Sequence, residues 1–218
     1  MEIMLKDRPD WCISRQRDWG IPIPLFYESE SGKLHPNQDK ILNQASEAIK
    51  SSGIDSWANI DLGIEEKGFE KSKDIFDVWF DSGITHFCVI DELFGSNTQS
   101  DLYLEGSDQH RGWFQSSLLT SIAMKGIAPY KSVLTHGFVV DDEGRKMSKS
   151  IGNVVSPQEI IKDSGADILR YWIASTDFRG EMAFSKDIFS RAIDGFRRIR
   201  NTMRFMISNL YDFDQKFD

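Results

Sequence analysis

Cysteine is scarce in this sequence, and long hydrophobic runs are absent from it. The two cysteines, Cys12 and Cys88, lie far apart and form neither a paired metal-ligand motif nor a disulfide framework. No apolar run approaches the length of a membrane span, and the residues from Met1 to Asp7 do not resemble a secretory signal. We therefore expect a protein of the reducing cytoplasm with no membrane partner.

The charge balance is acidic. Asp and Glu number 34 against 26 Lys and Arg, which gives a net charge of −8. This balance argues against nonspecific coating of nucleic acid, although a local basic patch remains compatible with a nucleic-acid partner. Hydrophobic residues at 40% and charged residues at 28% are typical of a folded chain, and 218 residues suit one large domain or one domain with appendages.

Composition divides the chain into four segments. Residues 1–27 are rich in aromatic residues and arginine, whereas residues 28–72 are interpreted as a small α/β insertion in which the apolar residues of 41–49 share one helix face. Residues 73–176 hold the polar clusters that suggest chemistry. Residues 177–218 are predicted to be mainly helical.

The pattern of a strand, a helix and a second strand runs through residues 101–136. A short buried strand is predicted at 101–104, a helix over 109–125 that ends at Gly126, and another strand over 132–136. Such a unit gives a parallel sheet with a right-handed crossover, which indicates the α/β class.

Two further helices are predicted toward the end of the chain. Ser156 is a candidate cap with Pro157 in the first turn, and Glu159 would close a capping box. Apolar residues then recur at steps of three and four over 184–210, where Ser185 is a candidate N-cap.

Polar clusters stand where the two predicted strands end. Residues 105–110 (EGSDQH) follow the first strand, and residues 135–137 (THG) end the second. Because open parallel sheets bind ligands at the carboxyl ends of their strands, these clusters are candidates for a ligand site. Carboxylates there can accept hydrogen bonds from ribose hydroxyls or an ammonium group. The alternative is that Glu105 and Asp108 only cap the following helix.

A third cluster, residues 145–150 (RKMSKS), lies between Gly144 and Gly152. The compact charges of Lys146 and Lys149 suit a polyphosphate, and the flanking glycines allow the loop to close over it. By composition alone, a solvated surface loop is the alternative.

These segments resemble the class I aminoacyl-tRNA synthetases. Residues 146–150 spell KMSKS, the signature of the class, and residues 104–114 resemble the active-site segment of its isoleucine branch. Residues 10–16 resemble a stretch shared by the isoleucine and valine branches, and residues 77–83 resemble the isoleucine version. The resemblance implies the second half of a Rossmann-like, parallel-sheet nucleotide-binding fold, with a small insertion and a helical C-terminal extension.

The resemblance also implies roles for residues of the lysine loop and the following helix. Lys149 would bind the ATP phosphates and stabilise the leaving pyrophosphate, with Lys146 in support. Met147 and Ser148 would belong to the same ATP-binding segment. Trp113 would line the amino-acid pocket or, as an alternative, only pack in the core.

The adenylate pocket would be formed by the two clusters at the strand ends. In this resemblance Glu105 contacts the amino acid and the sugar, and Asp108 is the candidate for the ribose hydroxyls. His136 and Gly137 would present backbone to adenine. The implied pocket residues are Glu105, Gly106, Asp108, Gln109, His136 and Gly137.

One signature of the class is missing from the chain. The family carries a motif of histidine and glycine near the start of its nucleotide fold, and no such motif surrounds His35, His86, His110 or His136. His35 and His86 lie outside any polar cluster and are interpreted as surface or structural residues. We therefore expect a part of a longer enzyme that is inactive alone.

The implied reaction joins isoleucine to tRNA(Ile) through isoleucyl-adenylate, with ATP and its Mg²⁺ as co-substrates and no zinc site in this segment. The parent enzyme is expected to be monomeric, whereas this chain is expected to self-associate through an unpaired strand edge. The arginines of the last helix either pair with Asp187 and Asp194 or contact tRNA phosphates. Two alternatives stay open: a free-standing adenylate- or RNA-binding module, and a part of a valine enzyme.

Overall fold

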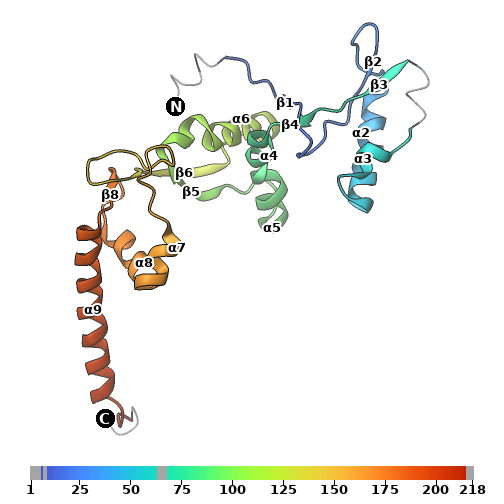
Figure 1. Cartoon of the computed structure of the whole chain (residues 1–218). Coiled ribbons are helices and arrows are strands. Elements are labelled where there is room, and N and C mark those ends of the chain that lie inside the picture. The colour runs from blue at the N-terminus through green and yellow to red at the C-terminus, as the bar shows by residue number, and fades with distance from the viewer. Residues whose placement is uncertain (1–5, 7–8, 63–67, 215–218) are drawn as a thin grey trace. The chain divides into compact units, whose positions relative to one another are not determined.

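The structure is a computed structural model that describes residues 6, 9–62 and 68–214. Contacts between residues divide the chain into two units, each of which is described by itself (Figure 1). The first unit comprises Met1–Tyr103 and Asp108–Val133, and the second comprises Leu104–Ser107 and Leu134–Asp218.

The first unit contains a small α/β subdomain that overlaps the predicted insertion at 28–72 and begins two residues before it, at Phe26. Strand β2 (Phe26–Glu28) pairs antiparallel with β3 (Phe69–Lys71), and helices α2 (Gln38–Ser52) and α3 (Ser56–Asn59) complete it. Helix α2 stops at Gly53, whose φ of +82° suits a residue without a side chain. The predicted helix face is confirmed, since the core consists of Phe26, Ile41, Ala45 and Trp57.

The rest of the first unit is built around a contact between two helices. Helix α4 (Val78–Gly83) packs on α6 (Trp113–Lys125), and a Cβ on Gly83 would lie 3.2 Å from the backbone of Ser116. A glycine therefore permits the close approach of these helices. The part of the unit that the structure describes before β5 also holds strands β1 (Ser14–Arg15) and β4 (Ile75–Phe76), which pair antiparallel, a π-helix at His86–Asp91 and helix α5 (Glu92–Phe94).

The predicted strand–helix–strand unit is confirmed. Strand β5 (Ser100–Gly106) and strand β6 (Tyr130–His136) are neighbours in one sheet and are joined through α6. Helix α6 begins later than predicted, because a 3₁₀ helix (Ser107–Arg111) and the non-helical Gly112 precede it. It ends at Gly126, which adopts the left-handed conformation that closes many helices.

The prediction that the first of these strands is buried was wrong. Leu102 is 46% exposed and Leu104 is 54% exposed, while Tyr103 between them is buried. Within the described chain β5 has β6 as its only strand neighbour, so its other edge is unpaired. Self-association through this strand stays a prediction.

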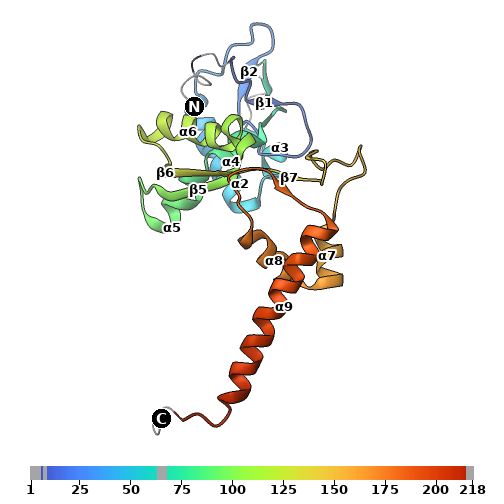
Figure 2. The same cartoon turned by 90° about the vertical axis from the view of Figure 1, so that its left-hand side faces the viewer.

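The second unit carries the parallel pairing and the C-terminal helices. Strand β7 (Val139–Val140) pairs in parallel with β8 (Met182–Ala183). Helices α7 (Pro157–Ser164) and α8 (Ala166–Ser175) lie beside the start of α9 (Lys186–Asn209) in both views (Figure 1, Figure 2). The core of this unit is formed by Trp172, Phe184 and Phe189.

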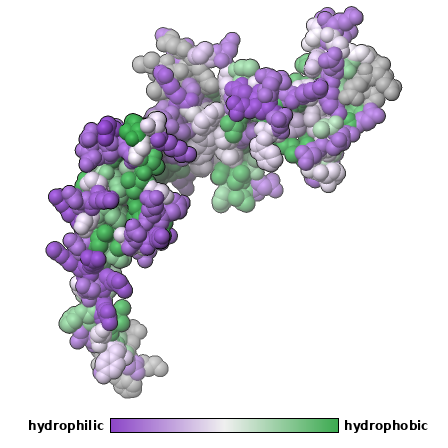
Figure 3. Space-filling view, viewed as in Figure 1, coloured by the Kyte–Doolittle hydropathy of each residue, from purple (hydrophilic) through white to green (hydrophobic). Residues whose placement is uncertain are grey.

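Helix α9 follows the prediction closely. The side chain of Ser185 accepts a hydrogen bond from the backbone N–H of Ile188, as an N-cap should. One of the two predicted acidic partners is paired, with 3.6 Å between Arg197 and Asp194. Apolar side chains stay exposed beside charged ones along the later part of α9 (Figure 3), and they are Ile199, Met203, Phe205, Met206, Ile207 and Leu210.

The predicted capping box at α7 was wrong. Ser156 makes no side-chain hydrogen bond to the helix backbone, because its hydroxyl donates to Oε1 of Gln158 at 2.7 Å. The Pro157 start itself is confirmed. Among residues that the structure describes, every helix is too short or too polar to cross a lipid bilayer.

Candidate active site

The ends of β5 and β6 bring two predicted site residues together in the second unit. Nε2 of His136 lies 4.0 Å from Oε1 of Glu105, and both side chains are partly exposed. Oε1 of Glu105 also accepts a hydrogen bond from the backbone N–H of Gly106 at 3.1 Å. The carboxylate and the imidazole are therefore held at the strand ends and remain open to a polar ligand.

Gly137 is confined by the protein backbone. Its N–H donates to the carbonyl of Phe178 at 3.0 Å, and a Cβ at this position would lie 2.0 Å from the carbonyl oxygen of Gly180. The sequence predicted a glycine that lets a ligand approach. The structure gives it a different close neighbour, the turn that leads into β8.

We expect Gly137→Ala to destabilise the second unit by about 1–3 kcal/mol, because overpacking forces the backbone apart. The matched control is Gly180→Ala on the facing segment, where a Cβ would meet no atom within 4 Å. Urea unfolding of the two variants checks this. Equal midpoints for both variants would contradict the steric argument.

The helix-capping alternative for Glu105 and Asp108 is wrong. The cap of α6 comes from Gln109, whose Oε1 accepts a hydrogen bond from the backbone N–H of Trp113 at 3.0 Å. Asp108 is exposed, and within the described residues its carboxylate receives a single hydrogen bond, from Nε2 of Gln109 at 3.2 Å. The carboxylate of Asp108 therefore does not cap α6.

Trp113 has the packing partners of a structural residue. Its ring stacks on Tyr103 with 4.2 Å between ring centroids, and its Nε1 donates to the carbonyl of Ser82 at 3.0 Å. The indole remains partly exposed, so these contacts fix its orientation without hiding it.

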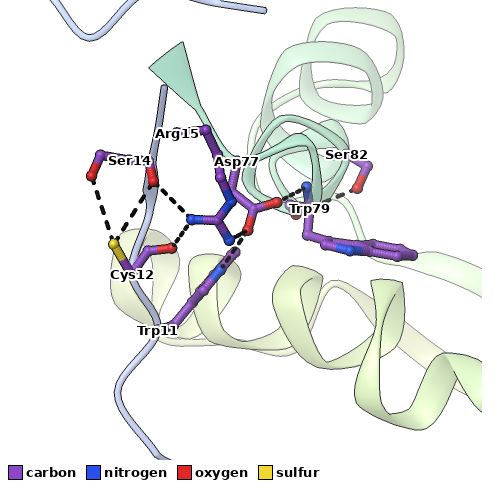
Figure 4. A network of polar contacts seen from close by, with 7 residues as sticks. All are labelled: Trp11, Cys12, Ser14, Arg15, Asp77, Trp79 and Ser82. Carbon is purple, nitrogen blue, oxygen red and sulfur yellow. Dashed lines mark hydrogen bonds and ion pairs between the residues drawn. The ribbon is translucent and has the colours of Figure 1, made fainter. Parts of the chain in front are cut away.

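Asp77 joins the two segments of the first unit that carry the resemblance to the isoleucine branch (Figure 4). This buried carboxylate accepts hydrogen bonds from Nε1 of Trp11 at 3.2 Å and from the backbone N–H of Trp79 at 2.9 Å. It also forms an ion pair with Arg15. Sequence reasoning named both segments but gave these residues no role, since the contact joins positions far apart in the chain.

The lysine loop, residues 144–152, follows the turn after β7 in the second unit. Met147 packs against the core cluster of Trp172, and the ammonium of Lys146 lies 4.0 Å from the ring centroid of Phe138. Lys149 is exposed, and no carboxylate of the described chain forms an ion pair with it. The loop therefore has an apolar anchor and an ammonium group available to an anion.

Among the residues that the structure describes, no group of three or more His, Cys, Asp or Glu side chains is arranged to hold a metal ion.

Polar residues at the strand ends and a lysine loop after them are both present in this chain, and its sequence matches a known protein family. The family model for "tRNA synthetases class I (I, L, M and V)" matches residues 1–185, and the chain belongs to this family. Curated relatives of the chain include isoleucine--tRNA ligases. The one from Alcanivorax borkumensis is 56% identical over all of this chain and 24% of its own length. That of Coxiella burnetii is 57% identical over 99% of this chain and 23% of its own length.

Solved structures share the fold. The LeuRS–tRNA–LeuAMS ternary complex of Agrobacterium radiobacter matches 93% of this chain and 28% of its own, with a TM-score of 0.67 and 20% identity. The Mycobacterium tuberculosis methionyl-tRNA synthetase with methionyl-adenylate matches 88% of this chain and 30% of its own, with a TM-score of 0.55 and 21% identity. The predicted Rossmann-like class is thus confirmed. This chain spans about a quarter of the length of its curated relatives.

Proposed function

We propose that this chain supplies the second half of the adenylate-forming site of an isoleucine--tRNA ligase. The observation that carries the proposal is the lysine loop: Lys149 is exposed, and among the residues that the structure describes it has no ion-pair partner, on a loop anchored by Met147. Such a charge can follow the negative charge that develops on the leaving pyrophosphate. Catalysis then comes from positioning and electrostatics.

The remaining residues are proposed to bind the adenylate. Glu105 contacts the amino acid and the sugar, and Asp108 accepts hydrogen bonds from the ribose hydroxyls. Support comes from the exposure of both carboxylates, neither of which caps α6. Lys146 assists Lys149, and Trp113 borders the amino-acid pocket. The proposed contacts with the adenylate and ATP are completed by Gly106, Gln109, His136, Gly137, Met147 and Ser148.

The partners follow from the same proposal. Isoleucine, ATP and tRNA(Ile) are the substrates, and Mg²⁺ would arrive on the ATP phosphates. The relatives are named for isoleucine, which favours that amino acid over the valine alternative. The proposed location is the cytoplasm, where tRNA charging takes place.

The test replaces the matching segment of the Alcanivorax borkumensis enzyme with this chain. We expect the chimera to catalyse isoleucine-dependent exchange of pyrophosphate into ATP. The purified 218-residue chain is expected to show no exchange, because it lacks the histidine and glycine signature of the class. Exchange is measured with radiolabelled pyrophosphate.

The amino-acid dependence supplies the control. Valine in place of isoleucine is expected to lower kcat/KM by about 10- to 200-fold, the range that one methylene gives in an apolar pocket. A folded chimera without isoleucine-dependent exchange would contradict the proposed function. A preference for valine would favour the valine branch.

A further inference from the structure

Asp141 lies at the start of the turn before the lysine loop. It accepts hydrogen bonds from residues on both sides of that loop. It follows β7 directly and is buried. Its Oδ1 accepts hydrogen bonds from the backbone N–H groups of Glu143 at 3.1 Å and Arg145 at 2.8 Å. Its Oδ2 accepts from Nδ2 of Asn153 and from Nε of Arg145, each at 2.9 Å.

The charge of Asp141 is stable across the physiological range. The hydrogen bond from Asn153, helped by those from Arg145, lowers the pKa of Asp141 to about 2. The carboxylate therefore stays ionised wherever the chain is folded in neutral or mildly acidic solution. Charge-assisted hydrogen bonds of this kind are stronger than neutral ones.

Asn153 reaches the loop from its other end. Its Oδ1 accepts a hydrogen bond from the backbone N–H of Ser148 at 2.8 Å, and its Nδ2 lies 3.4 Å from the carbonyl oxygen of Lys146. The same Nδ2 donates to Asp141. One amide side chain thus ties the backbone between the two lysines to a buried carboxylate.

These contacts fix the backbone of the loop and do not involve the ammonium groups of its lysines. Neither Asp141 nor Asn153 bonds to the side chain of Lys146 or Lys149 in the described chain. Lys149 stays exposed. A loop held in this way loses less conformational entropy when it closes on a polyphosphate, and its charges start near their working positions.

We propose that Asp141 and Asn153 form a clasp that positions the lysine loop for the phosphates of ATP. This inference rests on the proposed function and extends it to two residues outside the KMSKS motif. They are positioning residues, since they act through the backbone of residues 146–148. A side chain that only stabilised the fold would change the thermal midpoint without changing turnover.

The first experiment measures pyrophosphate exchange in the chimera described above. We expect Asn153→Ala to lower kcat about 10- to 100-fold, the cost of a misplaced catalytic group, with little change in the KM for isoleucine. Asn201→Ala is the matched control, because Asn201 is exposed on α9 and far along the chain from the loop. It should leave kcat and the thermal midpoint unchanged.

Exchanging the two residues tests whether the contact between Asp141 and Asn153 matters, or only the presence of an amide at position 153. Asn153→Asp alone sets two carboxylates against each other and should lower kcat at least as far as Asn153→Ala. Combining it with Asp141→Asn restores a donor and an acceptor at the contact. The double variant should therefore recover part of the lost kcat. If the two residues acted independently, the double variant would instead lose the kcat of both single variants combined.

Hydrogen exchange in the 218-residue chain tests the clasp without any catalysis. The amide of Ser148 loses its acceptor in Asn153→Ala and should exchange about 10-fold faster or more. Unchanged exchange at Ser148, or an active chimera whose kcat stays within about 2-fold in Asn153→Ala, would overturn the clasp alone. An inactive chimera that carries the unchanged segment would overturn the proposed function instead.

Discussion

Lys149→Ala should lower the kcat of isoleucine-dependent pyrophosphate exchange about 100- to 1000-fold in the chimera. The physical reason is the loss of a charge placed where negative charge develops on the leaving group, an interaction worth this much in comparable sites. The KM for isoleucine should change little, since the amino acid binds elsewhere. Steady-state exchange rates at saturating ATP measure the effect.

Two comparisons make the result specific to Lys149. Lys162→Ala removes an exposed lysine of the same unit and should have no effect. Lys146→Ala should cost less than Lys149→Ala, because its ammonium already lies over the ring of Phe138. Full activity in Lys149→Ala would remove the main support for the proposed pyrophosphate role.

Lys125→Met should destabilise the first unit by about 3–5 kcal/mol, the usual cost of breaking a buried ion pair from one side. Nζ of Lys125 lies 2.6 Å from Oδ2 of Asp91, and the two side chains are 7% and 13% exposed. Nζ also donates to the carbonyl of His86 at 3.0 Å. Within the described chain the other oxygen of Asp91 has no hydrogen-bond partner, so the carboxylate depends on this lysine.

Urea unfolding followed by circular dichroism checks this expectation. The matched control is Lys131→Met, since Lys131 and Asp101 are 2.7 Å apart but strongly exposed, and a surface pair contributes little. Replacing both partners, as in Lys125→Met with Asp91→Leu, should recover much of the loss. Equal effects of the two single variants would show that burial does not govern the strength of these pairs.

Local patterns predicted the elements that depend on neighbouring residues. The helix over 184–210, its Ser185 cap and the stop of α6 at Gly126 were all predicted from spacing and residue type, and the structure confirms them. The KMSKS residues are likewise a local signal, and they indicated the family that the comparisons confirm. Hydrogen bonds within one turn and the absence of a Cβ act over a few residues, so the sequence alone specifies them.

Burial was predicted less well, because it depends on what lies across the fold. His86 was interpreted as surface or structural, and the structure decides for a structural residue, fully buried with Nε2 3.1 Å from Oγ1 of Thr120. Burial and the nearby Lys125 lower the pKa of His86. For Leu102 and Leu104 the prediction of burial was wrong, since apolar residues of a strand are covered only where a neighbouring layer exists.

The sequence by itself therefore determined the family, the main helices and the residues of the lysine loop. Only the tertiary structure decided that Asp77 joins two distant segments and that Asn153 ties the loop to Asp141. Each of these contacts joins side chains whose separation along the chain follows no helical or strand period. Their geometry is set by the path of the whole backbone, which local propensity does not encode.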